Sequence, residues 1–519
     1  MTALSMTIIR PGQTPQSCRL EPFPVVNGGL TESCTIKIVP PQGQSWEFLI
    51  DDEPLLTDPE GHWTWAPGFY AGRVLASLVG DGSVVSRYII DIGTHPDKLS
   101  TEAHERMLKE LKAFRPELVI GSEPATGMLG TMGDSDDPWV AFRRLRLHAP
   151  SFITALKRVA RNPIRRTRAS RRVGPLRTAR RIDPRTLLSA AANGRIGVLS
   201  GCNASLESGH DQPDPHFDLV HVEEHLDSPA NRALKAMLEG VLRRARILMD
   251  VLEHHVSLHS ASGAETSLKR RWPVRKQFLT RLESKLLRLT RQQPFLSASE
   301  GSITTAGLIA IAAHPEYSRA HKTGWLCVRN GIEDLHDLES VWLCPTWALY
   351  ERWCFWKVIS HLERRLEVKG LITWQQDAAE WEAEIKVEKT ISILFQGNFS
   401  SFSAPSRQGR YSISGHRVPD IVVTLNGSSD QRFLVLDAKY RHSRSNVLDA
   451  MSSAHIYNDS LRWNDNRPWR SLLLIPAGGE AAWLEDSEFH DLHGVGVVQS
   501  SPGCSSRVLE DLLDKFLSS

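Results

Sequence analysis

Two aspartates and a lysine lie at the ends of two short apolar runs near the C-terminus. The runs are VPDIVVTL at 418–425 and RFLVLDAK at 432–439, with Asn426-Gly427 between them. β-branched residues on either side of Asn-Gly predict a β-hairpin. Because side chains alternate along a strand, Asp437 and Lys439 are expected on one face, and strand pairing brings Asp420 close to them.

These three side chains suit metal-assisted hydrolysis. A carboxylate among Leu, Val and Ile is costly to bury unless it is paired or binds a metal ion. Mg²⁺ prefers oxygen ligands, and a bound ion favours a hydroxide nucleophile and stabilises charge on a phosphate. Lys439 can orient the attacking water or neutralise the pentavalent state. The alternative is a surface hairpin with a structural Asp–Lys ion pair, because Asp-x-Lys is short and common.

The longer pattern resembles a known family. Pro419-Asp420, followed seventeen positions after the aspartate by Asp437-Ala438-Lys439, resembles the signature of the PD-(D/E)XK nuclease superfamily, and PDI with LDAKY resembles its McrC-like branch. Upstream, LYERW at 349–353 resembles the start of that branch's first nuclease helix. Downstream, HIYND at 455–459 resembles its His-x-Tyr-Arg-Asp helix, with Asn458 in place of arginine. The likeness covers about the last 180 residues, and a weaker likeness to the uncharacterised N-terminal domain fused to such nucleases extends through much of the middle of the chain.

This resemblance implies a restriction-endonuclease-like α/β/α core with a mixed sheet. It implies that Glu351, Asp420, Asp437 and the backbone carbonyl of Ala438 hold Mg²⁺, for which Mn²⁺ can substitute, while Lys439 assists water attack on a phosphodiester. Two further residues are expected to contact substrate or to support the metal ligands: His455 and Tyr457. On the helix expected at 446–460, His455 is predicted to face the site, whereas Tyr457, two positions on, is predicted to face elsewhere and to pack.

Glu351 is also unusual for its surroundings. Residues 347–366 read as a helix, and the residues about one turn from Glu351 are mainly apolar. A carboxylate on that face points into an apolar environment. The alternative is that it tilts to the edge of the helix and pairs with Arg352 or another base.

Composition and length indicate the class of protein and the number of domains. The 519 residues, 41% hydrophobic and 24% charged, indicate an ordinary globular protein of two or three domains. No apolar run approaches the roughly eighteen residues of a membrane span, and the first residues lack a secretory pattern, so we expect a cytoplasmic protein with no membrane partner. The predicted fold class is α+β, with a β-rich domain at 1–97, a mainly helical domain at 98–335 and the nuclease domain at 336–519.

A strongly basic segment lies in the middle of the chain. Residues 157–185 hold twelve Lys or Arg and one acid, Asp183. A segment so charged is not expected to fold on itself, and phosphates are its natural complement. We predict a flexible or partly ordered arm whose DNA contacts include Arg165, Arg166, Arg168, Arg171 and Arg172. The alternatives are a solvated linker or a face paired with a partner protein, and the net charge of +2 favours none of them.

The chain has no phosphate-binding loop of the form Gly-x₄-Gly-Lys-Ser/Thr, so it is not its own motor. The McrC-like resemblance implies a separate AAA+ NTPase or another recognition subunit as partner. Together these patterns predict a metal-dependent DNA endonuclease subunit of a restriction or anti-phage system. One alternative is a catalytically silent scaffold that binds DNA or a partner. A plain DNA-binding module, for which the basic segment is essential and Lys439 dispensable, is another.

Overall fold

The structure is a computed structural model in two compact units. It describes residues 2–43, 45–81, 83–121, 125–129, 137–179, 181–192, 216–261, 267–329, 339–375, 380–387, 389–403, 409–427, 431–504 and 507–518. The first unit comprises Met1–Val140, His259–Val274 and Asn330–Ser519, and the second comprises Ala141–Leu258 and Arg275–Arg329. None of the helices in these described ranges has the length and apolar character that crossing a membrane requires. The fold is α+β, as predicted.

The N-terminal part of the first unit is β-rich, which confirms the prediction. Its strands are β1 (Leu4–Ile9), β2 (Gln16–Leu20), β3 (Val26–Thr31), β4 (Thr35–Ile38), β5 (Trp46–Ile50), β6 (Glu53–Pro54), β7 (Trp63–Trp65), β8 (Gly72–Gly80) and β9 (Ser83–Gly93). One sheet has the order β2-β1-β4-β7, and β3, β5, β6, β8 and β9 join a second sheet with β10 (Ala125–Leu129) and β13 (Glu339–Trp342). Buried and less buried residues alternate along β8, because one face of its sheet packs into the core.

The C-terminal part of the first unit contains a seven-stranded mixed sheet. Its order is β14 (Leu371–Gln375), β15 (Glu380–Lys386), β16 (Thr390–Phe395), β19 (Ile421–Asn426), β20 (Gln431–Ala438), β22 (Arg470–Ile475) and β23 (Val495–Gln499). Neighbours from β14 to β20 are antiparallel, whereas β20, β22 and β23 are parallel. The predicted hairpin is β19–β20, with Ile421 opposite Leu436. These central strands are apolar on both sides because helices cover both faces of the sheet.

Alternate residues of β22 pack on the two covered faces of the sheet. Leu472 and Leu474 pack with α9 (Thr346–Leu366), α12 (Arg507–Ser518) and α1 (Thr101–Phe114). Leu473 and Ile475 pack with α10 (Arg444–Ser460), and α11 (Ser487–His493) lies beside β23. The strands β17 (Ser400–Ser401), β18 (Arg410–Ser412) and β21 (Leu461–Trp463) form a small separate sheet. The α/β/α core with a mixed sheet is therefore as predicted.

Helix α1 begins at Thr101, yet its Met107 and Leu111 belong to the core of the nuclease sheet. The short helix η1 (Pro116–Val119) adds Leu118 and Val119 to the same core. The division of the chain into domains at 97 and 335 stays a prediction.

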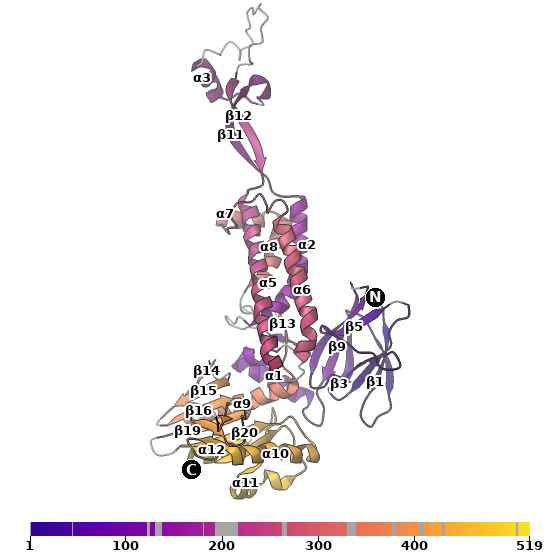
Figure 1. Ribbon diagram of the computed structural model, residues 1–519, viewed down its shortest axis with the longest axis vertical. Coiled ribbons are helices and arrows are strands. Elements are labelled where there is room, and N and C mark those ends of the chain that lie inside the picture. The colour runs from indigo at the N-terminus through magenta and orange to yellow at the C-terminus, as the bar shows by residue number, and fades with distance from the viewer. Residues whose placement is uncertain are drawn as a thin grey trace, which may run out of the picture. The chain divides into compact units, whose positions relative to one another are not determined.

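The second unit is mainly helical. Its longest helices run side by side in Figure 1 and are joined by pairs such as Phe142 with Phe278 and Arg246 with Glu283. The helices are α2 (Pro138–Arg161), α3 (Pro184–Ala192), α5 (Pro229–Ala261), α6 (Ser267–Thr290), α7 (Thr305–Ala312) and α8 (Pro315–Val328), with the short η2 (Leu176–Thr178). Helix α5 begins directly after Ser228, whose hydroxyl accepts a hydrogen bond from the backbone N–H of Asn231.

The basic segment is not the arm that its charge predicts. It continues from the end of α2 into β11 (Arg166–Pro175), which pairs along its whole length with β12 (His216–His225). Acids of β12 and one acid of the segment neutralise part of the charge through the pairs Arg165–Glu224, Arg172–Glu223, Arg171–Asp218 and Arg171–Asp183. The expectation that this charged segment does not fold was wrong because most of the acids that pair with it lie about fifty residues further along the sequence, and its contact with DNA stays a prediction.

Candidate active site

The hairpin brings the two predicted aspartates together. Asp420 directly precedes β19, and Asp437 is the penultimate residue of β20, next to the partner of Ile421. Oδ2 of Asp420 accepts the backbone N–H of Ala438 at 2.9 Å. Strand register, rather than a flexible loop, therefore fixes the distance between the two carboxylates.

Lys439 lies against both aspartates. Its Nζ is 2.8 Å from Oδ2 of Asp437 and 3.4 Å from Oδ2 of Asp420. Burial alone lowers the pKa of the Lys439 ammonium, but attraction by the two carboxylates outweighs it and raises the pKa overall. Lys439 therefore remains a cation at neutral pH.

Glu351 completes the cluster from α9. Its side chain is buried, and burial together with the nearby charge of Asp437 raises its pKa to about 7, although Lys439 opposes the shift. Burial, Asp437 and Glu351 likewise raise the pKa of Asp420 well above its usual value. The alternative pairing of Glu351 with Arg352 is not found, because Arg352 donates to the carbonyl of Leu118 at 2.6 Å. Acidic groups whose pKa values are raised in this way are typical of functional sites.

The donor set fits a hard divalent cation. Asp437 is only 1% exposed, and its Oδ1 is buried without a hydrogen-bond partner among the described residues. Its Oδ2 accepts the hydroxyl of Ser453 at 2.7 Å as well as the Lys439 ammonium. Three clustered carboxylates offer only oxygen ligands, as Mg²⁺ prefers. The predicted ligand role of the Ala438 carbonyl, between Asp437 and Lys439 in sequence, stays a prediction.

Comparison with known proteins finds a family match over the part of the chain that carries the carboxylate cluster. Residues 348–466 match the family model of the PD-(D/E)XK nuclease superfamily. This chain carries a PD-(D/E)XK nuclease domain. The matched range contains Glu351, Asp420, Asp437 and Lys439. The sequence has no match among curated proteins. A solved structure of Thermococcus gammatolerans, a refined half-complex from a tetradecameric assembly of McrB AAA+ hexamers with bound McrC, is 13% identical, with 89% of this chain and 86% of that chain covered and a TM-score of 0.24.

In the nuclease domain, α10 presents Tyr457 rather than His455 to the aspartates. Burial and the charges of Asp437 and Asp420 raise the pKa of Tyr457, whose hydroxyl lies 3.5 Å from the carbonyl of Val418. His455 is exposed and makes no hydrogen bond or ion pair with any residue in the described ranges. The structure therefore reverses the predicted orientations of these two side chains.

The sequence did not point to Ser453, which lies on α10, like Tyr457, and donates its hydroxyl to Asp437. It precedes Tyr457 by four residues, so the two lie one turn apart on one face of α10. The buried stripe of α10 gives the signal, because Val447, Ala450 and Ala454 fix the face that meets the sheet. Continuing that stripe at helical spacing reaches Tyr457 and passes by His455.

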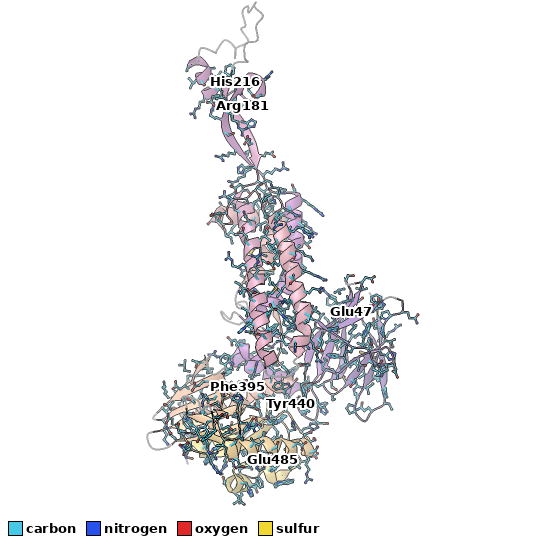
Figure 2. All side chains as sticks on the ribbon, in the orientation of Figure 1. Glu47, Arg181, His216, Phe395, Tyr440 and Glu485 are labelled. Atoms are coloured by element: carbon cyan, nitrogen blue, oxygen red, sulfur yellow. The ribbon has the colours of Figure 1, made fainter. Side chains whose placement is uncertain are left out.

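Two cavities meet at Glu351. The larger, about 480 Å³, is lined by Phe69, Lys98, Trp347, Glu351, Ala438, Lys439, Tyr440, Arg441 and Asn446. The smaller, about 330 Å³, is lined by Glu351 and by residues such as Trp139, Arg352 and Phe395. Figure 2 labels Tyr440 of the larger cavity and Phe395 of the smaller one. Lys98 comes from outside the nuclease match and was not predicted as a site residue.

Proposed function

We propose that this protein is a metal-dependent DNA endonuclease subunit that hydrolyses phosphodiester bonds in the cytoplasm. The observation that carries the proposal is the unpartnered, buried Oδ1 of Asp437 beside two carboxylates with raised pKa values. Such a cluster costs folding free energy. A scaffold gains nothing from this cost, whereas a nuclease needs the negative oxygens.

Glu351, Asp420 and Asp437 would hold Mg²⁺ or Mn²⁺, which when bound supplies hydroxide near neutral pH and stabilises charge on the phosphate. The chain itself contributes the ammonium of Lys439. Because the pKa of Lys439 is raised, Nζ acts as a hydrogen-bond donor and positive charge, and does not take the proton from water. Ser453 keeps Asp437 oriented by donating its hydroxyl to Oδ2.

The larger cavity is the proposed path of the DNA backbone. Lys98, Lys439 and Arg441 line it and offer three positive charges near the acidic cluster. The Lys98 ammonium lies 4.9 Å from the centre of the Phe69 ring and 5.0 Å from that of Tyr440, so aromatic faces hold it in place. A phosphate is the natural complement of such a lining.

Cleavage assays test the activity. Supercoiled and linear DNA are incubated with Mg²⁺ or Mn²⁺ and the wild type, Lys439→Ala or Asp437→Ala, each alone and with co-purified genomic neighbours. We expect both variants to cut DNA at least about a hundredfold more slowly than the wild type, because each lacks a group that stabilises the transition state. Lys386→Ala is the control, because this exposed lysine of the same domain pairs with Glu384.

The opposite result is equally informative. If no preparation cleaves DNA under any condition, and calorimetry detects no Mg²⁺ or Mn²⁺ binding, the nuclease fold is a silent scaffold for DNA or partner binding.

We further propose that the subunit belongs to a restriction or anti-phage system and works with a separate AAA+ NTPase or recognition subunit. Support comes from the likeness of the LYERW, PDI, LDAKY and HIYND segments to the McrC-like branch, and from a sequence without a phosphate-binding loop. Co-expression with genomic neighbours should yield a stable complex. Purification of the chain alone from every such co-expression would contradict this part of the proposal.

A further inference from the structure

A second group of metal-ligating side chains lies outside the catalytic cluster. His95 and Asp97 stand in the connection between β9 and α1, and His442 stands between β20 and α10, three residues after Lys439. One potential ligand atom from each of the three residues lies within 4.8 Å of the other two. The two imidazole rings have centroids 5.0 Å apart and an interplanar angle of 35°.

A buried carboxylate holds the two connections together. Glu32 accepts the backbone N–H of His95 at 3.3 Å and the hydroxyl of Tyr440 at 3.2 Å. Tyr440 is two residues before His442, so Glu32 restrains both sides of the group. The three ligands are therefore positioned by a hydrogen-bonded frame and do not depend on a chance approach of exposed side chains.

Both histidines have a nitrogen suited to a cation. Nδ1 of His95 lies 3.8 Å from Oδ2 of Asp97, and its lone pair accepts the backbone N–H of Asp97 at 3.3 Å, a hydrogen bond that a bound ion would replace. Nδ1 of His442 is buried and has no hydrogen-bond partner among the described residues.

The spacing leaves a small adjustment for a bound ion. With metal–ligand bonds of about 2.1 Å, two ligand atoms of a tetrahedral site lie roughly 3.4 Å apart. The ligand atoms at 4.8 Å or less must therefore approach by about 1 Å, which side-chain rotation supplies. Lys98 opposes the ion electrostatically, whereas Asp97 favours it.

We propose that His95, Asp97 and His442 bind a late first-row divalent cation, with Zn²⁺ as the reference ion. Two imidazoles and one carboxylate suit Zn²⁺, while the carboxylate cluster at Asp437 suits Mg²⁺. The ion joins the connection after β9 to the segment that begins with Lys439. The site is independent of DNA cleavage, so its existence does not rest on the proposed nuclease activity.

Another group, Asp58, Glu60 and His62, also brings ligand-type atoms within 4.8 Å. Its acids are already paired with Lys37, whose Nζ is 2.9 Å from Asp58 and 3.3 Å from Glu60. A resident ammonium takes the place of a metal ion there, so this group serves as the control.

Calorimetric titration with Zn²⁺ alone tests the site. The full chain carrying Asp437→Ala, which weakens the catalytic cluster, is titrated in excess Mg²⁺ to fill what remains of that cluster. We expect one Zn²⁺ per chain, and an affinity at least about tenfold weaker after His95→Ala or His442→Ala. His62→Ala should bind Zn²⁺ like the parent. Equal Zn²⁺ affinity in the parent and in His442→Ala overturns the proposal.

The variant Asp97→Asn tests whether lost Zn²⁺ binding is caused by loss of a ligand or by misfolding. The Asp97 side chain is 73% exposed, so its loss does not disturb the core. This variant should also bind Zn²⁺ about tenfold more weakly, and Co²⁺ bound to it should lose the strong visible absorption of a four-coordinate site. An unchanged Co²⁺ spectrum in both Asp97→Asn and His442→Ala contradicts the assignment.

Discussion

The hydroxyl of Ser453 is the neutral partner of the most buried carboxylate in the site. It donates to Oδ2 of Asp437 at 2.7 Å, and replacing Ser453 with alanine leaves that oxygen with the Lys439 contact alone. Loss of a hydrogen bond to a charged group costs roughly 1.5–3 kcal/mol. We expect Ser453→Ala to cleave DNA at least about tenfold more slowly than the wild type, as measured by single-turnover kinetics in Mg²⁺.

The adjacent serine provides the comparison. The hydroxyl of Ser452 donates to the carbonyl of Asp449 and is exposed, so Ser452→Ala should cleave at the wild-type rate. Equal rates for Ser452→Ala and Ser453→Ala would show that the orientation of Asp437 does not depend on this hydroxyl.

At the residue scale, the sequence allowed prediction of the groups whose positions follow from strand alternation and register. Asp420, Asp437 and Lys439 belong to this class, and Glu351 follows from its apolar helix face. Ser453 and Lys98 do not, because each enters the site through the packing of a separate element. The orientation of His455 was predicted wrongly because the interpretation placed the motif residue, and not the buried stripe of α10, toward the sheet.

Helix α9 is positioned at its first residue by the N-terminal part of the chain. The hydroxyl of Thr346 contacts the buried Glu32, and the backbone N–H of Thr346 donates to the carbonyl of Phe69 at 2.7 Å. Glu32 also accepts the Tyr440 hydroxyl, next to Lys439. One carboxylate therefore links the elements that carry Glu351 and Lys439.

Glu32→Gln should weaken this link. Glutamine keeps one acceptor oxygen where Glu32 accepts three donors, and it places an NH₂ group against one of them. We expect a loss of roughly 2 kcal/mol in the free energy of unfolding, together with slower cleavage at saturating DNA. Urea denaturation and kcat report the two effects. Glu60→Gln is the control, since the Glu60 side chain is 67% exposed, and a Glu32→Gln protein as stable as this control would argue against the link.

Helix α1 carries a buried histidine that makes stability depend on pH. Burial, and then the charge of Lys112, lower the pKa of His104 to about 4 from an ordinary value of 6.5. The unfolded chain therefore binds a proton at a higher pH than the folded chain does. The stability is fully present above about pH 6.5 and is lost as the pH falls toward 4.

Between pH 7 and pH 5 this histidine should cost roughly 2 kcal/mol of unfolding free energy. His104→Leu removes the proton site while keeping a side chain suited to the apolar core, so its stability should fall less steeply over the same range. Urea denaturation of both proteins at several pH values measures the difference. Parallel pH profiles would mean that His104 is already protonated in the folded state or is not buried.

At the element scale, prediction succeeded where the pattern of apolar residues was continuous and local in the sequence. The hairpin β19–β20 and helices α9 and α10 lie within about three residues of the predicted ranges. The hairpin β11–β12 was missed because its strands are ten residues long, highly charged and separated by forty residues. Ion pairs join the two strands, and hydrophobic periodicity does not reveal them.

Over the whole molecule, the net charge of +2 conceals how positive charge is distributed. Arg165, directly before β11, pairs with Glu224, and Arg172 of β11 pairs with Glu223, whereas Arg166 and Arg168 of β11 are exposed and have no ion pair among the described residues. If this strand contacts DNA as its sequence predicts, the exposed pair makes the phosphate contacts. Arg171 instead bridges Asp183 and Asp218 and is expected to stabilise the hairpin.

The dependence of DNA affinity on salt separates these roles. Each lost phosphate contact should reduce the slope of log K against log salt concentration by about 0.9. The double variant Arg166→Ala/Arg168→Ala should therefore lower the slope by nearly two and weaken binding to all sequences alike. The double variant Arg165→Ala/Arg172→Ala removes the same formal charge from the same segment, but these arginines are already paired with glutamates, so a smaller change is expected. Equal slopes for both variants and the wild type would assign the basic strand to structure, and would leave DNA binding to the cavity beside Lys98 and Lys439.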